Sequence, residues 1–514
     1  MGGMPLPPVS VVDVDGIPAY WADVRAAFVG SLTFGVGRRD ETARTAGLAH
    51  LIEHLVMARI GRVHVAHNAT TGDETIAFYA QGSPEAVADY LTRVADAIST
   101  LHEITDDAVA EQRRIISNEL GGGDERPGRG HLVDRFGNQS LGLLDLGSPA
   151  HRSHTRAEVL RFADDWLHAG NAALSFTGPV PEGLSLNLPP ARPVPVRPEP
   201  TVIRHGQWVV NGQTPVVISL RLDADDLATA NIAAILIADA LFDTLRTARH
   251  LIYAVEPFFF SLAGDSWIAG YALDPRSEHA LETAAAALEV IRGLASDGPT
   301  AEAIREQITR SQTADDEPDS HAEYVDSRAV SMLRGRRARG DVSAPSPVDD
   351  VTPDGVRGLL ARSVDSVFVT FSEDLEADSE EQITKALGLP PAEDPDPHFI
   401  SLNKWELMRH YTLDTTEIFS GKLFSGARGE ELVVDTERVS LVADGVFEVR
   451  FDDIVLATYS EQLKLWSLMA RPGHILFVDL DQWRGAKKLH ALLGDRVPGE
   501  VQCEVDAAVP ANDR

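Results

Sequence analysis

The chain has 514 residues, with 78 acidic and 46 basic side chains and a formal net charge of −32. This charge argues against nucleic acid and anionic membranes as main partners, because both are bound through basic surfaces. The 44% hydrophobic content excludes disorder throughout. A single cysteine, Cys503, excludes an internal disulfide. With no signal-peptide pattern at the N-terminus, we expect a cytoplasmic protein.

Proline-rich stretches at residues 188–200 and 389–397 divide the chain. Proline removes backbone donors and fixes φ, so each stretch is expected to be an extended linker. At about 150 residues per domain, the length also suggests three domains. The predicted domains are residues 1–187, 201–388 and 398–514.

The first two predicted domains share one order of strands and helices, which predicts a duplicated α+β unit. No apolar run approaches the roughly 18 residues of a membrane span. In the first domain we expect strands at 26–34, 75–80 and 172–177 and helices at 43–57, 84–101, 106–120 and 156–167. In the second we expect strands at 215–222, 257–262, 266–273 and 366–370 and helices at 227–246, 277–294, 300–311 and 354–362.

The third domain has a different pattern. Residues 446–451 alternate between apolar and polar, as a half-buried strand should. Further strands are expected at 432–434, 438–442 and 475–478, followed by a helix near 482–493. This order predicts a small β-rich domain closed by one helix, with a distant resemblance to the pleckstrin-homology-like class.

The most informative stretch is residues 47–57, which contains His-x-x-Glu-His on a predicted helix. His50 and His54 lie one turn apart on the same face, so both imidazoles can hold one Zn²⁺. Glu53 lies near that face and can act as a general base. This is the inverted zincin motif. A pattern of five residues can also arise by chance, so its context matters.

A catalytic zinc needs a third protein ligand and an open fourth position. Glu119, at the end of the predicted helix 106–120, is the candidate, although an exposed glutamate at a helix end is the ordinary alternative. His64 and His67 also follow the motif closely. We expect them to be surface or loop histidines rather than metal ligands.

With these residues in view, the sequence resembles the pitrilysin family of zinc peptidases, which includes insulin-degrading enzyme and the mitochondrial processing peptidase. Gly47 before the motif, the segment Asn68-Ala69-Thr70-Thr71 after it and the helix that ends at Glu119 match the layout of the family. The resemblance covers about residues 8–375. It implies two homologous α/β-sandwich domains, each an antiparallel sheet with helices packed on it.

The resemblance also implies roles for individual residues. One Zn²⁺ per chain would be bound by His50, His54 and Glu119, with Glu53 as the general base. Asn68 and Ala69 would lie on a strand edge that docks an extended peptide. Gln112 stands where the family has a supporting glutamate, and its neutral amide would tune the ligands less. The family's Gly-Thr after the motif is replaced by residues 58–61, and the chain between His54 and Asn68 is shortened.

Residues 245–255 resemble the Arg…Tyr element of the second family domain. Arg246 and Tyr253 would supply donors to a polarised carbonyl or its oxyanion. The ordinary alternatives are a cation favoured at a helix C-terminus for Arg246 and an amphipathic strand residue for Tyr253.

Together these features predict a zinc-dependent endopeptidase that hydrolyses peptides or unfolded protein segments. Two family domains form half of a four-domain chamber, so the resemblance implies a homodimer or a heterodimer with a related chain. The alternatives are a non-catalytic partner or scaffold subunit and a peptide-binding protein.

Overall fold

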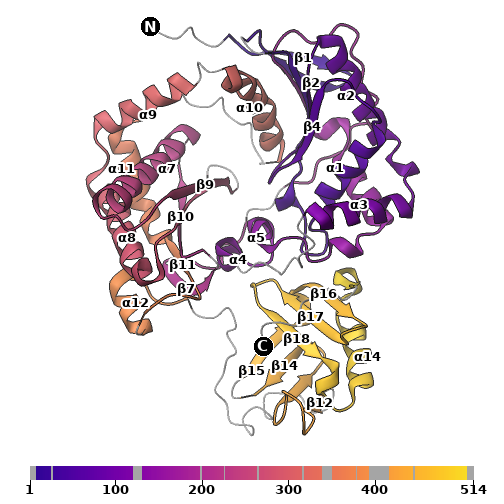
Figure 1. The fold of residues 1–514 in the computed structure, drawn as a ribbon, viewed down its shortest axis with the longest axis vertical. Coiled ribbons are helices and arrows are strands. Elements are labelled where there is room, and N and C mark those ends of the chain that lie inside the picture. Colours follow the sequence, from indigo (N-terminus) through magenta and orange to yellow (C-terminus); the bar gives the residue numbers. More distant parts are fainter. Residues whose placement is uncertain are drawn as a thin grey trace. The chain divides into compact units, whose positions relative to one another are not determined.

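The computed structural model describes residues 7–24, 27–119, 130–196, 200–212, 214–224, 226–262, 266–314, 318–337, 350–377, 379–392, 416–443 and 446–505 (Figure 1). The chain divides into two compact units. Unit 1 comprises Met1–Asp40, Leu48–Gln112 and Thr155–Pro391, and unit 2 comprises Glu41–Gly47, Arg113–His154 and Ala392–Arg514. The domain boundaries suggested by the proline-rich stretches stay predictions.

The first sheet of unit 1 has the strand order β1-β2-β6-β3-β5-β4. Its strands are antiparallel except for the parallel pair β2–β6. Among the described strands β4 pairs only with β5, so β4 forms an edge of the sheet. The strands are β1 (Ser10–Val14), β2 (Ile17–Trp21), β3 (Val29–Phe34), β4 (Ala66–Thr71), β5 (Ile76–Gln81) and β6 (Ala172–Phe176).

Helices cover both faces of this sheet. Val87 of α2 (Pro84–Ser99) packs against Gly30 and Phe176, whereas Asp326 of α10 (Pro318–Arg337) accepts a hydrogen bond from Ser175. Because adjacent strand residues point to opposite faces, α2 and α10 lie on opposite sides of β6. The other helices of this domain are α1 (Leu48–Arg59), α3 (Asp106–Glu119) and α6 (Arg156–Trp166).

The second sheet of unit 1 has the order β7-β11-β8-β10-β9 and again contains one parallel pair, β7–β11. Its core continues into the helices, through side chains such as Leu220, Ile237 and Leu288. The strands are β7 (Gln207–Gly212), β8 (Val216–Asp223), β9 (Val255–Ser261), β10 (Ser266–Leu273) and β11 (Phe368–Ser372). The helices are α7 (Leu227–Leu241), the π-helix η6 (Phe242–Ala248), α8 (Ala280–Asp297), α9 (Ala301–Ala314), α11 (Pro353–Ser363) and α12 (Glu380–Leu387).

The repeated order of strands and helices confirms the predicted fold class, two homologous α/β domains followed by a β-rich domain.

The expectation that no apolar run approaches the length of a membrane span is wrong. The span Leu227–Ala248 is long and apolar enough to cross a membrane by length and composition. It forms α7 and η6, which pack against α8, and it contributes Ile232 and Leu245 to the core of the second domain.

Unit 2 contains two four-stranded sheets, in the orders β12-β13-β14-β15 and β18-β17-β16-β19. The helix α14 (Ala486–Arg496) adds Leu489 and Leu493 to their shared core. The strands are β12 (Glu417–Ser420), β13 (Glu431–Val434), β14 (Arg438–Val442), β15 (Val446–Arg450), β16 (Ile454–Ser460), β17 (Leu465–Ala470), β18 (Ile475–Asp479) and β19 (Gln502–Glu504). The resemblance to the pleckstrin-homology-like class stays a prediction.

A segment from the first half of the sequence packs onto this β-rich part. Val133 of α4 (His131–Phe136) and Leu143 of α5 (Leu143–Leu146) form one apolar cluster with Leu456 and Met469. Asn138 is also held there, because its side-chain amide donates to the Ala470 carbonyl at 2.8 Å. The remaining short helices are η1 (Arg38–Asp40), η2 (Leu101–Glu103), η3 (Ser140–Gly142), η4 (His151–Ser153), η5 (Ala169–Asn171), η7 (Ser277–His279), η9 (Val364–Ser366), η10 (Phe451–Asp453), η11 (Leu480–Gln482) and η12 (Gly499–Val501).

Candidate active site

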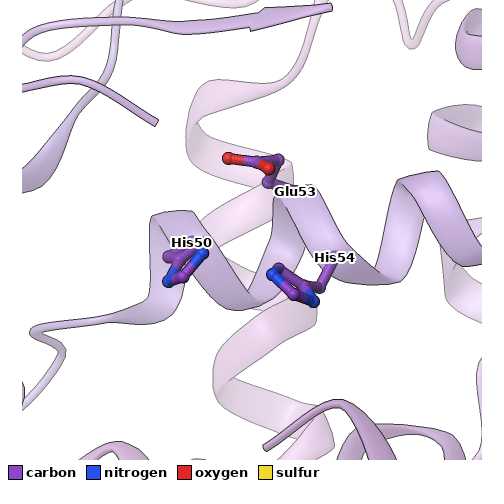
Figure 2. Close-up of side chains that lie close together, drawn as sticks. All are labelled: His50, Glu53 and His54. Atoms are coloured by element: carbon purple, nitrogen blue, oxygen red, sulfur yellow. The ribbon is translucent and has the colours of Figure 1, made fainter. Parts of the chain in front are cut away.

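The helix α1 carries the inverted motif. Leu51, Ile52, Leu55 and Val56 are buried, so packing fixes the rotation of the helix about its axis. His50, Glu53 and His54 are only half-buried, and their side chains project from the helix in Figure 2. The two imidazole rings lie 4.7 Å apart between centroids, at an interplanar angle of 82°. The helix therefore places two imidazole rings side by side.

This group of side chains fits a metal ion. Each of His50, Glu53 and His54 offers one ligand atom, and these atoms all lie within 4.8 Å of one another. Two neighbouring imidazole nitrogens suit Zn²⁺, and the Glu53 carboxylate lies beside them at the distance expected of a group that acts on a metal-bound water. In the part of the chain that the structure describes, no other such group of three metal-binding side chains was found, and neither His64 nor His67 belongs to it.

A hydroxyl group orients the Glu53 carboxylate. Thr71 Oγ1 donates a hydrogen bond to Glu53 Oε2 at 2.6 Å. Thr71 is the last residue of β4, so this bond joins α1 to the edge strand of the first sheet. No separate role was predicted for Thr71, although it closes the Asn68-Ala69-Thr70-Thr71 segment. Hydrogen bonds to a charged carboxylate are short and comparatively strong.

The edge strand β4 contains both predicted peptide-docking residues. Asn68 is exposed and Ala69 is buried, as the alternation of a strand requires. The Asn68 carbonyl accepts a hydrogen bond from the Tyr90 hydroxyl at 3.1 Å. Burial raises the pKa of that hydroxyl, and Tyr79 and Glu53 raise it further. Tyr90 therefore stays protonated and anchors β4 to α2.

The predicted third ligand lies on α3. Glu119 is the last residue of this helix and is exposed, and Gln112 is half-buried two turns earlier. Glu119 belongs to unit 2, whereas His50 and His54 belong to unit 1. The roles of Glu119 as a ligand and of Gln112 as its support therefore stay predictions.

Within unit 2, the side chain two residues before Glu119 is in contact with a histidine. Ser117 Oγ lies 2.8 Å from His151 Nε2. Burial lowers the pKa of His151 to about 4, and the charge of Arg152 acts in the same direction. His151 is therefore neutral near pH 7.

Arg246 and Tyr253, the two residues of the predicted Arg…Tyr element, are in direct contact. The Arg246 guanidinium carbon lies 4.7 Å from the centroid of the Tyr253 ring and 4.9 Å from that of Phe242. The cation is thus held by two aromatic faces. Phe242 and Arg246 lie on a π-helix, a distortion that often marks functional sites. Phe242 was missed, although its place four residues before Arg246 on a helix was a usable sign.

A carboxylate holds the backbone beside the Tyr253 ring. Asp274 Oδ1 accepts hydrogen bonds from the amides of Tyr253 and Ala254, both at 2.9 Å. The Tyr253 side chain is nevertheless 74% exposed. Its ring is thus presented to solvent on a fixed backbone. Asp274 was also missed, and its sequence sign is an aspartate directly after a strand and before a proline.

Buried charges join the β4–β5 hairpin to other parts of unit 1. Glu74, which precedes β5, bonds Arg39 at 2.6 Å and Arg334 of α10 at 2.5 Å. The Arg39 side chain is fully buried and also donates to the carbonyls of Ser261 and Leu262 in the second domain. The Glu74 carboxylate therefore links the β4–β5 hairpin directly to α10, and through Arg39 to the end of β9.

Comparisons with known proteins agree with this architecture. The family model described as Insulinase (Peptidase family M16) matches residues 25–139, and the one described as Peptidase M16 inactive domain matches residues 153–311. A search of the curated proteins found no match. The chain therefore has the two-domain architecture of a peptidase, and it belongs to the pitrilysin family, peptidase family M16.

Solved structures show the same fold at low sequence identity. Pitrilysin is 16% identical with a TM-score of 0.57, over 77% of this chain and 50% of pitrilysin. The periplasmic protease PqqL from Escherichia coli is 13% identical with a TM-score of 0.57, over 86% of this chain and 56% of PqqL. A protease from Helicobacter pylori is 15% identical with a TM-score of 0.55, over 71% of this chain and 99% of that protease. This chain thus spans about half the length of pitrilysin.

Proposed function

We propose that the protein is a zinc-dependent endopeptidase that hydrolyses peptides or unfolded protein segments. One observation carries the proposal: the side-chain nitrogen and oxygen atoms of His50, Glu53 and His54 lie within 4.8 Å of one another on one helix. The hydrogen bond from Thr71 to Glu53 ties that group to an edge strand. Membership of the pitrilysin family supports the same function.

The proposed chemistry is addition of water to a peptide carbonyl. His50 and His54 would hold one Zn²⁺, with Glu119 as the third ligand. When bound, Zn²⁺ supplies Lewis acidity, which makes water nucleophilic near neutral pH. Glu53 takes a proton from the water as the new C–O bond forms. It then gives that proton to the amine nitrogen as the C–N bond breaks. The bond from Thr71 keeps the carboxylate in one orientation during both transfers.

The substrate is proposed to bind as an extended strand. Because β4 is an edge among the described strands, its backbone offers hydrogen-bonding groups to a peptide beside Asn68 and Ala69. Arg246 and the Tyr253 hydroxyl would donate to the carbonyl or its oxyanion. An extended backbone is required, so folded proteins would be poor substrates.

Assembly and location follow as further proposals. Since the chain spans half the length of pitrilysin, a homodimer or a heterodimer with a related chain would complete an enclosed site. We also propose a cytoplasmic protein.

The alternative function is a non-catalytic partner, scaffold or peptide-binding subunit. It is favoured by one finding, the match of residues 153–311 to a family model described as an inactive domain. The His50, Glu53 and His54 side chains in the other half favour catalysis.

The test combines metal content with cleavage of a mixed peptide pool by the purified full chain. Wild type and Glu53→Gln should both bind one zinc per chain, and only wild type should cut. His50→Ala should lose zinc. His64→Ala is the matched control, because His64 is exposed and close in sequence, and it should keep both zinc and activity. Wild type without zinc, or equal cutting by Glu53→Gln, would reject the proposal. Zinc without any cutting would favour the non-catalytic alternative.

A further inference from the structure

The loop between β12 and β13 presents two apolar side chains to solvent. Phe424 is 98% exposed and Leu423 is 55% exposed. We call residues 422–425 the tip loop. Exposed apolar residues scattered singly over a surface are normal. Here two are consecutive, and one of them is a phenylalanine with almost no contact to the protein.

The tip loop is held in a defined conformation. The Lys422 amide donates to the Gln482 carbonyl at 2.8 Å, and the Lys422 ammonium donates to the Asp481 carbonyl at 2.7 Å. Ser425 Oγ donates to the Lys422 carbonyl at 3.0 Å, which closes the turn. The exposure of Phe424 is therefore built into the loop by its backbone contacts.

The surroundings of the tip loop are basic, although the chain has a net charge of −32. Residues 418–429 and 482–494 contain no aspartate or glutamate. The two stretches adjoin, because the Arg484 amide donates to the Ser420 carbonyl at 3.0 Å. Together they carry five exposed cations, which we call the basic collar: Lys422, Arg428, Arg484, Lys487 and Lys488.

Two acidic groups near the collar form ion pairs, and Glu430 directly follows residues 418–429. Glu417 pairs with Lys488 at 2.7 Å, and Asp481 pairs with Lys464 at 3.1 Å. The remaining negative charge of the chain is screened beyond about 8–10 Å at physiological salt. A surface in contact with the tip loop therefore meets these local charges, in which the collar cations predominate, and not the average charge of the chain.

We propose that the tip loop docks the C-terminal domain onto an anionic lipid surface. Phe424 and Leu423 would enter the boundary between headgroups and acyl chains, and the collar would lie over the headgroups. Exposed phenylalanine and leucine beside lysine and arginine are the residue types that bind such interfaces. Phe424 and Leu423 form a small apolar tip, whereas a protein partner is usually bound through a larger packed apolar patch. The prediction of no membrane partner rests on the overall charge, which averages over this segregation.

The first experiment measures binding of the full chain to phosphatidylcholine vesicles with and without phosphatidylglycerol. Binding should require phosphatidylglycerol and weaken with added salt. The double variant Leu423→Ser/Phe424→Ser should lower affinity by about tenfold or more. Each of Arg484→Ala and Lys487→Ala should lower it by about fivefold. Phe477→Ser is the matched control, since Phe477 is 56% exposed in the same domain and should change nothing.

The second experiment reports insertion directly. Cys503 is the only cysteine, so Phe424→Cys in a Cys503→Ser background takes a single polarity-sensitive dye. Dye emission should shift to the blue on anionic vesicles and be quenched by brominated lipid. Phe477→Cys in the same background should show neither change.

Several outcomes would overturn the proposal. These are no binding to anionic vesicles, or binding that the tip variants leave unchanged. Equal, tip-independent binding to heparin or DNA would show a general polyanion surface instead. Loss of self-association in Leu423→Ser/Phe424→Ser, without any vesicle binding, would identify a contact between copies of the chain. Thermal unfolding of each variant would show that it remains folded.

Discussion

Thr71 Oγ1 donates to Glu53 Oε2 at 2.6 Å, so the proposed general base is oriented by the edge strand proposed to bind substrate. A bond of this kind to a charged group contributes about 1.5–3 kcal/mol. Thr71→Val removes the donor at nearly constant shape and should lower kcat by about tenfold or more, with zinc content unchanged. The control Thr70→Val, at an exposed neighbouring position, should be near neutral. Equal kcat values for the two variants would contradict this role for Thr71.

Phe242 should act through Arg246. Its ring forms one of the two aromatic faces at the guanidinium, and such a contact at an exposed site contributes about 0.5–1 kcal/mol. We expect Phe242→Leu to lower kcat/KM by about two- to fivefold on peptide substrates. Ile235→Ala, at another exposed apolar position of the same helical segment, should leave it unchanged.

Tyr253→Phe separates stacking from hydrogen bonding, because it keeps the ring beside Arg246 and removes only the hydroxyl. If that hydroxyl donates to the reacting carbonyl, kcat should fall while KM changes little. A rise in KM alone would assign Tyr253 to substrate binding.

Glu74 should be important for stability, and a neighbouring pair provides the control. Removing the carboxylate by Glu74→Ala leaves the fully buried Arg39 without its ion pair, which costs about 3–5 kcal/mol for buried pairs. Asp73→Ala breaks the Arg38–Asp73 pair, which is substantially exposed, and should cost at most about 1 kcal/mol. Thermal unfolding should show a large fall in Tm for the first variant only. Similar falls in Tm for both variants would mean that the residues around Arg39 and Glu74 rearrange to compensate for the lost carboxylate.

His151 predicts a loss of stability in acid. Burial lowers its pKa from 6.5 to about 4 in the folded protein, so the unfolded chain binds more protons between these values. The free energy of unfolding is therefore unaffected by protonation of His151 above about pH 6.5, and it decreases as the pH falls towards 4. Unfolding of His151→Gln should depend less on pH over this window. An unchanged pH dependence in this variant would contradict the proposed role of His151 in acid unfolding.

The sequence predicted well the features that depend on local spacing. The inverted motif was visible because helical periodicity fixes which side chains meet, whereas the Arg246–Tyr253 pair was predicted from the family resemblance, since the helix ends at Ala248 before Tyr253. The predicted start of α1 at residue 43 was too early, because residues 41–47 form a loop. Glu41 accepts a bond from the Gly47 amide at 2.9 Å, and Gly47 has φ +93°.

Features that depend on contacts between distant segments were missed. The helix α10 is mostly polar, and its apolar contacts with the first sheet come from Val325, Ala329 and Leu333, spaced four residues apart. That spacing was a usable sign, but polar neighbours obscured it. The bonds of Glu74 to Arg39 and Arg334 join residues far apart in sequence, and no local pattern predicts them.

The apolar cluster that joins Val133 and Leu143 to Leu456 and Met469 has a practical consequence for anyone engineering this chain. Ala43, in the loop that leads into the motif helix, belongs to the same cluster. A truncation before β12 would expose this surface and remove the packing partner of that loop. The C-terminal domain therefore cannot be removed without disturbing the loop before the motif helix. A shortened chain should aggregate or lose metal affinity rather than behave as a minimal enzyme.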